Sequence, residues 1–122
     1  MRRGGFVWII AWRYSNNCMA STRQEILRSM LEQKPEDGFA RYGLAMEFVR
    51  SGELETATEE FAKLLTYQPG YAAGYFHGGQ TLEKLGRTEE ARELYRKGIE
   101  VTTASGDEHT RSELIGALGM LA

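Results

Sequence analysis

Apolar residues recur every three to four positions through most of the chain after residue 20, which is the spacing of one face of an α-helix. Residues 54–66 show this pattern clearly, and the apolar positions there are Leu54, Ala57, Phe61, Leu64 and Leu65. Such a segment predicts a helix with one buried stripe and a charged outer face. The same reasoning predicts six helices, over residues 22–34, 38–50, 54–66, 72–85, 88–102 and 107–121.

Glycine and proline mark the boundaries between the predicted helices. Gly52 and Gly86 fall where two antiparallel helices must turn, and glycine takes the positive φ that such a turn often needs at no steric cost. Pro35 and Pro69 end the helices before them, because the residue before a proline is pushed away from the helical region. We therefore expect short turns between helices that alternate in direction.

Two segments of the chain repeat each other with a period of about 34 residues. The identical pairs are Pro35 and Pro69, Gly52 and Gly86, Glu55 and Glu89, Ala57 and Ala91, Glu59 and Glu93, and Lys63 and Lys97. Size and polarity persist where identity does not, as in Tyr42 with Phe76 and Phe61 with Tyr95. Six identities in one register indicate a repeated helix-turn-helix unit.

This pattern resembles the tetratricopeptide repeat over about residues 23–122. The matching residues are Leu44, Ala45, Phe48, Gly52, Ala57, Phe61 and Pro69 in one unit, and Tyr75, Gly79, Leu82, Gly86, Ala91 and Tyr95 in the next. The departures are Arg41 at the first aromatic site, Gly78 at the leucine site and Thr103 where a third proline would fall. They predict a weaker core in the second unit and an array that ends there. The resemblance implies an all-α fold, in which antiparallel helix-turn-helix repeats stack as a short right-handed solenoid of about six helices.

The repeat also predicts how the chain is divided. We expect a domain over residues 19–122, made of a half repeat at 22–37, repeats at 38–71 and 72–105, and a capping helix at 106–122. A cap is needed because the open end of a solenoid must hide its apolar face. Ser105 with Glu108 has the capping-box spacing ahead of this last helix.

Residues 1–18 differ in character from the rest and contain the apolar run Phe6–Trp12. This run is far shorter than the roughly 20 residues that span a bilayer, and no cleavage pattern follows it. The pair Arg2 and Arg3 lacks the spacing and the polar flank of a twin-arginine export signal. Two interpretations stay open. The segment is either a disordered extension from an upstream start codon, with Met19 as the natural start, or a short amphipathic strand or helix that packs on the repeats.

Composition narrows the function classes. Hydrophobic residues make up 42% of the chain and charged residues 26%, which is ordinary for a soluble globular domain. The net charge of -2 gives no electrostatic footprint for nucleic acid or an acidic membrane, so we expect neither as a partner. Cys18 is the one cysteine, and no cysteine and histidine cluster has metal-ligand spacing. We therefore expect no metal, no cofactor and a cytoplasmic protein.

Candidate catalytic groups have simpler explanations. The carboxylate pairs Glu59 with Glu60 and Glu89 with Glu90 stand near predicted helix starts, where negative charge is favourable without any acid-base role. The glycines of residues 70–79 do not follow a strand and match no phosphate-binding loop. We expect that the protein is not an enzyme.

The resemblance implies binding of an extended peptide in a concave groove that the first helix of each unit lines. The predicted groove residues are Phe39, Tyr42, Met46, Val49, Arg50, Ala73, Phe76, His77, Gln80 and Lys84. Phe39, Tyr42 and Met46 form a second apolar stripe, which a surface helix would not need for folding alone. The carboxylate clamp of chaperone adaptors needs lysine and asparagine where Tyr42, Met46 and His77 stand, so we do not expect a clamp.

Two functions fit this stripe. In the first, the chain is a protein-protein interaction module or adaptor that binds an unidentified protein or peptide segment in the groove. In the second, it is a self-associating structural module whose groove is buried in a homo-oligomer such as a homodimer, or is covered by residues before helix 38–50. Both predict buried aromatic side chains, so burial alone does not decide between them.

Overall fold

The computed structural model describes residues 22–121, so the predictions for residues 1–18 lie outside the described part of the chain. The helices within it are residues 22–33, α2 (Gly38–Ser51), α3 (Leu54–Tyr67), α4 (Ala72–Lys84), α5 (Thr88–Ser105) and α6 (Glu108–Met120). The six predicted helices are confirmed; the largest difference is at the end of α5, which we predicted at residue 102. No helix in residues 22–121 is long and apolar enough to cross a membrane.

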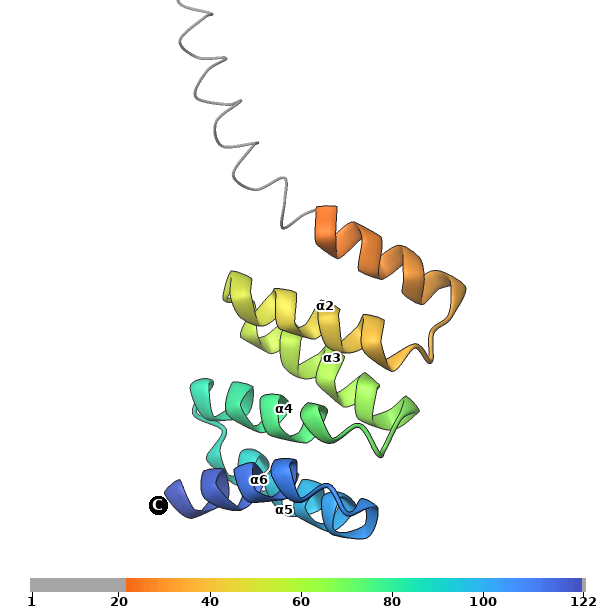
Figure 1. Ribbon diagram of the computed structural model, residues 1–122. Coiled ribbons are helices and arrows are strands. Elements are labelled where there is room, and N and C mark those ends of the chain that lie inside the picture. Colours follow the sequence, from red (N-terminus) through yellow and green to blue (C-terminus); the bar gives the residue numbers. More distant parts are fainter. Residues whose placement is uncertain (1–21, 122) are drawn as a thin grey trace, which may run out of the picture.

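Consecutive helices run antiparallel and form two layers. Figure 1 shows α2, α4 and α6 side by side in one layer, with α3 and α5 behind them and residues 22–33 at the end next to α2. Each helix from α2 to α6 packs on the next one along the chain, and α4 also contacts α6. We call α2, α4 and α6 the A helices and α3 and α5 the B helices. The arrangement is the short right-handed solenoid that the repeat predicted.

Two of the turns between helices contain a glycine with positive φ, as predicted. Gly52 and Gly86 have φ of 83° and 79°, in the left-handed region that a side chain disfavours. Gly106, with φ of 77°, ends α5 in the same way, although its position does not follow the repeat spacing. α5 runs past Thr103 because threonine, unlike the proline at position 69, keeps its backbone N–H and does not clash with the preceding turn.

The capping box predicted for the last helix was wrong. Ser105 is the last residue of α5, and its hydroxyl donates to the carbonyl of Thr102 at 3.3 Å. Asp107 caps α6 instead, where its carboxylate accepts the N–H of Thr110 at 3.1 Å. The backbone hydrogen bond to the Asp107 carboxylate lowers the pKa of that group, which keeps the cap charged.

The core consists of two clusters, one for each unit. The first contains Leu31, Ala40, Leu44, Ala45, Phe48, Ala57, Phe61 and Leu64, and the second contains Tyr75, Leu82, Ala91, Tyr95 and Leu114. In the second unit, glycines admit the two tyrosine rings: a Cβ on Gly79 would overlap the ring of Tyr95, and one on Gly98 would lie 2.6 Å from Cβ of Tyr75. Large rings against glycine therefore take the place of the side chains that the second unit lacks.

Arg41, the departure at the first aromatic site, is buried with 8% of its surface exposed. Its Nη1 donates to both carboxylate oxygens of Glu60, at 3.3 and 3.2 Å. The guanidinium also lies over the ring of Tyr67, with 5.4 Å from Cζ to the ring centroid. A buried ion pair thus occupies the place where an aromatic residue was expected.

Candidate partner-binding face

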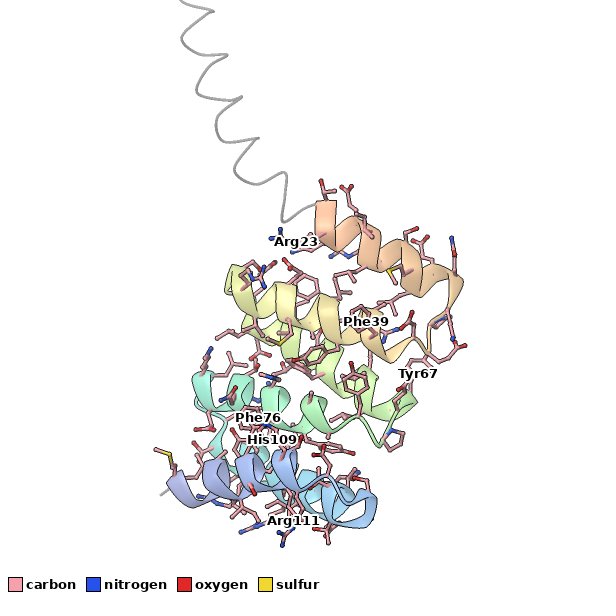
Figure 2. The ribbon with its side chains drawn as sticks, in the orientation of Figure 1. Arg23, Phe39, Tyr67, Phe76, His109 and Arg111 are labelled. Carbon is pink, nitrogen blue, oxygen red and sulfur yellow. The ribbon has the colours of Figure 1, made fainter. Side chains whose placement is uncertain are left out.

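The predicted groove residues lie on the surface of α2 and α4. We call this surface the A-helix face. Figure 2 shows Phe39, Phe76 and His109, which come from α2, α4 and α6 in turn. The exposed members of the predicted set are Phe39, Arg50, Gln80 and Lys84, and the half-buried members are Tyr42, Met46, Val49, Ala73, Phe76 and His77. None of the ten is fully buried, so all of them reach the surface.

The structure brings three of the predicted residues together as an aromatic cluster. The ring centroids of Tyr42 and His77 are 5.8 Å apart, and those of Phe76 and His77 are 5.2 Å apart, both in edge-on geometry. Tyr71 joins them, with its ring 5.6 Å from that of Tyr42. We use the term aromatic cluster for Tyr42, Tyr71, Phe76 and His77. It links α2 to α4 across the A-helix face, and such ring pairs are stabilising beyond their buried area.

Sequence reasoning missed Tyr71 because it stands outside the helix periodicity. It occupies the N-cap position of α4, directly after the turn of Pro69 and Gly70. An aromatic residue beside a helix start was the one available signal, and it does not say which neighbouring helix the ring meets.

Part of the predicted apolar stripe also supports the fold. Tyr42 and Met46 of the stripe pack against the first core cluster, as do their neighbours Val49 and Tyr71, and Phe76 packs against the second cluster. Phe39 is different, since 72% of its surface is exposed. The stripe therefore combines residues that anchor the helices with at least one large side chain that the described fold leaves uncovered.

The aromatic cluster is uncharged at neutral pH. Burial lowers the pKa of His77, against smaller opposing effects from the Glu113 carboxylate and a hydrogen bond with Gln80. Burial also raises the pKa of Tyr42 and of Tyr71 above the ordinary tyrosine value. Both changes favour the neutral forms, so the cluster is an apolar surface with polar tips.

Positive charge lies at one edge of the same face. Arg50 and Lys84 occupy equivalent places in the last turns of α2 and α4, and both are exposed. Arg50 Nη1 lies 3.4 Å from a carboxylate oxygen of Glu47, which also accepts from Nε of Arg23 at 3.0 Å. We call Arg50 and Lys84 the basic edge.

The third A helix, α6, extends the face. Glu113 acts electrostatically on His77 of α4, and Met120 is 87% exposed near the end of the helix. Sequence reasoning did not place α6 on this face, because α6 begins two residues later than the spacing between α2 and α4 would place it. The two extra residues change which side chains share a face.

Two of the clefts in residues 22–121 are related by the repeat. One of about 330 Å³ lies between α3 and α5 and has Phe61, Leu65, Leu82 and Leu94 in its lining. The other, of about 370 Å³, lies between residues 22–33 and α3 and is lined in part by Leu31 and Phe48. They are equivalent places one repeat apart, since Lys63 lines the second cleft and Lys97 the first. Across residues 22–121, no three His, Cys, Asp or Glu side chains group as metal ligands.

Comparison with known proteins finds tetratricopeptide repeat proteins by sequence and by structure. The family model described as tetratricopeptide repeat matches residues 72–104. A TPR repeat-containing protein of Pseudomonas aeruginosa is 26% identical over 90 residues, which are 74% of this chain and 86% of that protein. The solution structure of a tetratricopeptide repeat domain protein from Salinibacter ruber is 38% identical, covers 70% of this chain and 86% of that one, and has a TM-score of 0.66. The crystal structure of PcrH in complex with the chaperone binding region of PopD has a TM-score of 0.78 at 13% identity, covering 98% of this chain and 91% of that one.

Proposed function

This chain belongs to the tetratricopeptide repeat family, and we propose that it acts by binding an extended segment of another protein on its A-helix face. Its fold is that of a protein-interaction module. The observation that carries the proposal is the half-exposed aromatic cluster at the junction of α2 and α4, together with the exposed ring of Phe39. An apolar surface of this kind on a folded domain usually marks an interaction site.

The cluster suits binding because its rings are already held in place. Tyr42 contacts the rings of Phe61, Tyr71 and His77, so little freedom is lost when a partner packs on it. Met46 next to it is flexible and can adapt to the partner. Buried tyrosines at the centre of an interface often account for most of the binding energy.

The structural relatives support the mode of action. PcrH has the same fold and is seen with a region of another protein, PopD. At 13% identity this likeness concerns the fold alone, so the residues that bind a partner here are argued from this chain. In this proposal the chain is divided into a half repeat at 22–37, repeats at 38–71 and 72–105, and a capping helix at 106–122. The proposed role is non-catalytic, and the proposed location is the cytoplasm.

A peptide selection tests this proposal. Peptides of about 12 residues would be selected from a displayed library on the full chain, and their Kd measured on the wild type and on the double variant Phe39→Ser, Phe76→Ser. We expect the double variant to bind about 30-fold more weakly, in line with the loss of two interface anchors. Tyr67→Ser is the matched control, because Tyr67 is also an exposed aromatic residue but lies at the end of α3. Selected peptides that lose affinity for the control and not for the double variant would place the binding site elsewhere.

Self-association is the second candidate function, and the exposed Phe39 is the observation that favours it. A second copy of the chain could cover the same A-helix face. The mass in solution, measured with and without residues 1–18, separates the two candidates. A monomer in both cases supports the adaptor, whereas a dimer that Phe39→Ser dissociates supports self-association.

A further inference from the structure

The two A helices of the repeats present the same pair of features at the same spacing. On α2, Arg50 follows Tyr42 by eight residues, and on α4, Lys84 follows Phe76 by eight residues. A helix rises about 1.5 Å per residue, so the Cα of each cationic residue lies about 12 Å further along the helix axis than the Cα of the aromatic residue. The A-helix face therefore carries two parallel strips, one formed by the aromatic cluster and one by the basic edge.

The two cations of the basic edge are not fully used in ion pairs within residues 22–121. Glu47 is shared between two cations, Arg23 and Arg50, and so neutralises only one of them. Glu83, next to Lys84, is turned toward α5 and accepts the hydroxyl of Tyr95. Lys84 makes no ion pair within residues 22–121, although Glu53 and Glu83 place carboxylates beside the two cations in the sequence.

The strip of rings contains no charge that would compete for a ligand carboxylate. Tyr42 and Tyr71 are neutral at physiological pH, and burial also keeps His77 neutral there. Two carboxylates act on the pKa values of the cluster: Asp37 raises that of Tyr71, and Glu113 of α6 raises that of His77. An apolar side chain of a ligand would thus pack on the aromatic cluster, and an acidic side chain would bind at the basic edge.

We infer that the A-helix face recognises an internal segment of a partner protein in which a carboxylate lies about four residues from an apolar anchor. An extended chain rises about 3.3 Å per residue, so about four residues cover the distance between the strips. The apolar side chain packs on the aromatic cluster while the carboxylate meets Arg50 and Lys84. The partner does not need to present its carboxyl terminus, because Arg50 and Lys84 are exposed on long side chains and do not form a closed pocket around a chain end. This inference rests on the proposed function and adds the chemistry of the partner.

Synthetic peptides of about ten residues, acetylated and amidated, test the inference. One carries Leu and Phe as the anchor with two Glu about four residues away; a second has Lys in place of Glu; a third has Ser in place of the anchor. Each is titrated into the ¹⁵N-labelled full chain at about 0.05 M salt, and Kd is taken from the shift changes. We expect the Glu peptide to bind at least tenfold more tightly than the other two. High salt should reduce its advantage over the Lys peptide, because the pairs on this exposed edge are screened.

Charge reversal supplies the matched variants. Arg50→Glu with Lys84→Glu should reverse the preference in favour of the Lys peptide. Lys63→Glu with Lys97→Glu is the control, since these lysines are also exposed, are also equivalent positions of the two repeats, and lie on the B helices. Arg50→Gln with Lys84→Gln serves if the reversal lowers stability, and it should abolish the preference without reversing it.

The possible outcomes distinguish a failure of this inference from a failure of the proposed function. Equal binding of the Glu and Lys peptides, with shifts at Tyr42 and Phe76, would overturn the inference and leave the proposed function standing. Binding that needs a free carboxyl terminus would overturn the internal mode. If no anchored peptide shifts the A-helix face, the proposed function fails together with the inference.

Discussion

Arg41 and Tyr75 occupy equivalent positions in the two repeats, and each donates a hydrogen bond to the backbone carbonyl of the proline six residues before it. Arg41 Nη2 lies 3.1 Å from O of Pro35, and the Tyr75 hydroxyl lies 2.6 Å from O of Pro69. The two units thus make the same link between an A helix and the turn before it, with different side chains. The link satisfies a carbonyl that the end of the preceding helix leaves without a helical partner.

A related contact appears at the third A helix. Nε of Arg111 lies 3.0 Å from the hydroxyl of Thr103, which stands where the spacing of Pro35 and Pro69 would place a third proline. Arg111 follows Thr103 by eight residues rather than six, so two extra residues lie between the units. This insertion explains why α6 begins two residues late.

The buried pair of Arg41 and Glu60 should be replaceable by the pair at the equivalent places in the second unit, Tyr75 and Leu94. Glu60→Leu alone should lower the free energy of unfolding by about 3 kcal/mol, because it leaves a buried guanidinium without its carboxylate. Adding Arg41→Tyr should recover most of the loss. Urea unfolding of the two single variants and the double variant measures the coupling, and additive effects would show that the pair does not act as a unit.

Gly79 is required because the Tyr95 ring lies against it. Gly79→Ala should destabilise the fold by about 2 kcal/mol, since the added methyl group overlaps a fully buried ring. Gly116→Ala in α6 is the matched control, because a Cβ there meets nothing within 4 Å. The control should be stabilising by about 0.5–1 kcal/mol through helix propensity. Thermal melts that rank the two variants in the opposite order would contradict the packing of α4 on α5.

Ala57 and Ala91 are equivalent residues of α3 and α5, and both have no exposed surface. Ala57→Leu or Ala91→Leu should destabilise by about 1–3 kcal/mol, because the larger side chain forces the helices apart. Ala62→Leu is a suitable control, since Ala62 is an exposed residue of α3. Unchanged melting temperatures for both core variants would be inconsistent with the assigned repeat register.

His77 should make the stability depend on pH. Its pKa in the folded state is lowered by burial, so the unfolded chain binds a proton more readily than the folded one. The stabilising effect is complete above the unfolded pKa of about 6.5 and is lost as the pH falls from there toward the folded pKa. The wild type should therefore lose more stability between pH 7.5 and pH 5 than His77→Phe does.

An NMR titration of the His77 ring checks the cause directly. We expect a midpoint below about 6.5 in the wild type. Glu113→Gln should lower it further, because the Glu113 carboxylate opposes the effect of burial. A midpoint at or above the ordinary histidine value would show that the ring is more open to water than the structure indicates.

The helices and their turns could be derived from the sequence because the forces that define them are local. The spacing of Ala57 and Phe61 follows helix geometry, and the positive φ of Gly52 and Gly86 follows from the turn. The regularly spaced identities then placed two equal units in one register. The ten predicted groove residues came from the resemblance to the tetratricopeptide repeat together with helix spacing, and their role in binding stays a prediction.

Only the tertiary structure decided what crosses between helices. The pairing of Arg41 with Glu60, the position of Tyr71 beside Tyr42 and the action of Glu113 on His77 depend on how far one helix is shifted along another. That shift is set by packing of whole side chains, such as Tyr95 on Gly79, and no single position in the sequence encodes it. Periodicity determines which face a residue is on, whereas the packing of neighbouring helices determines what that face meets.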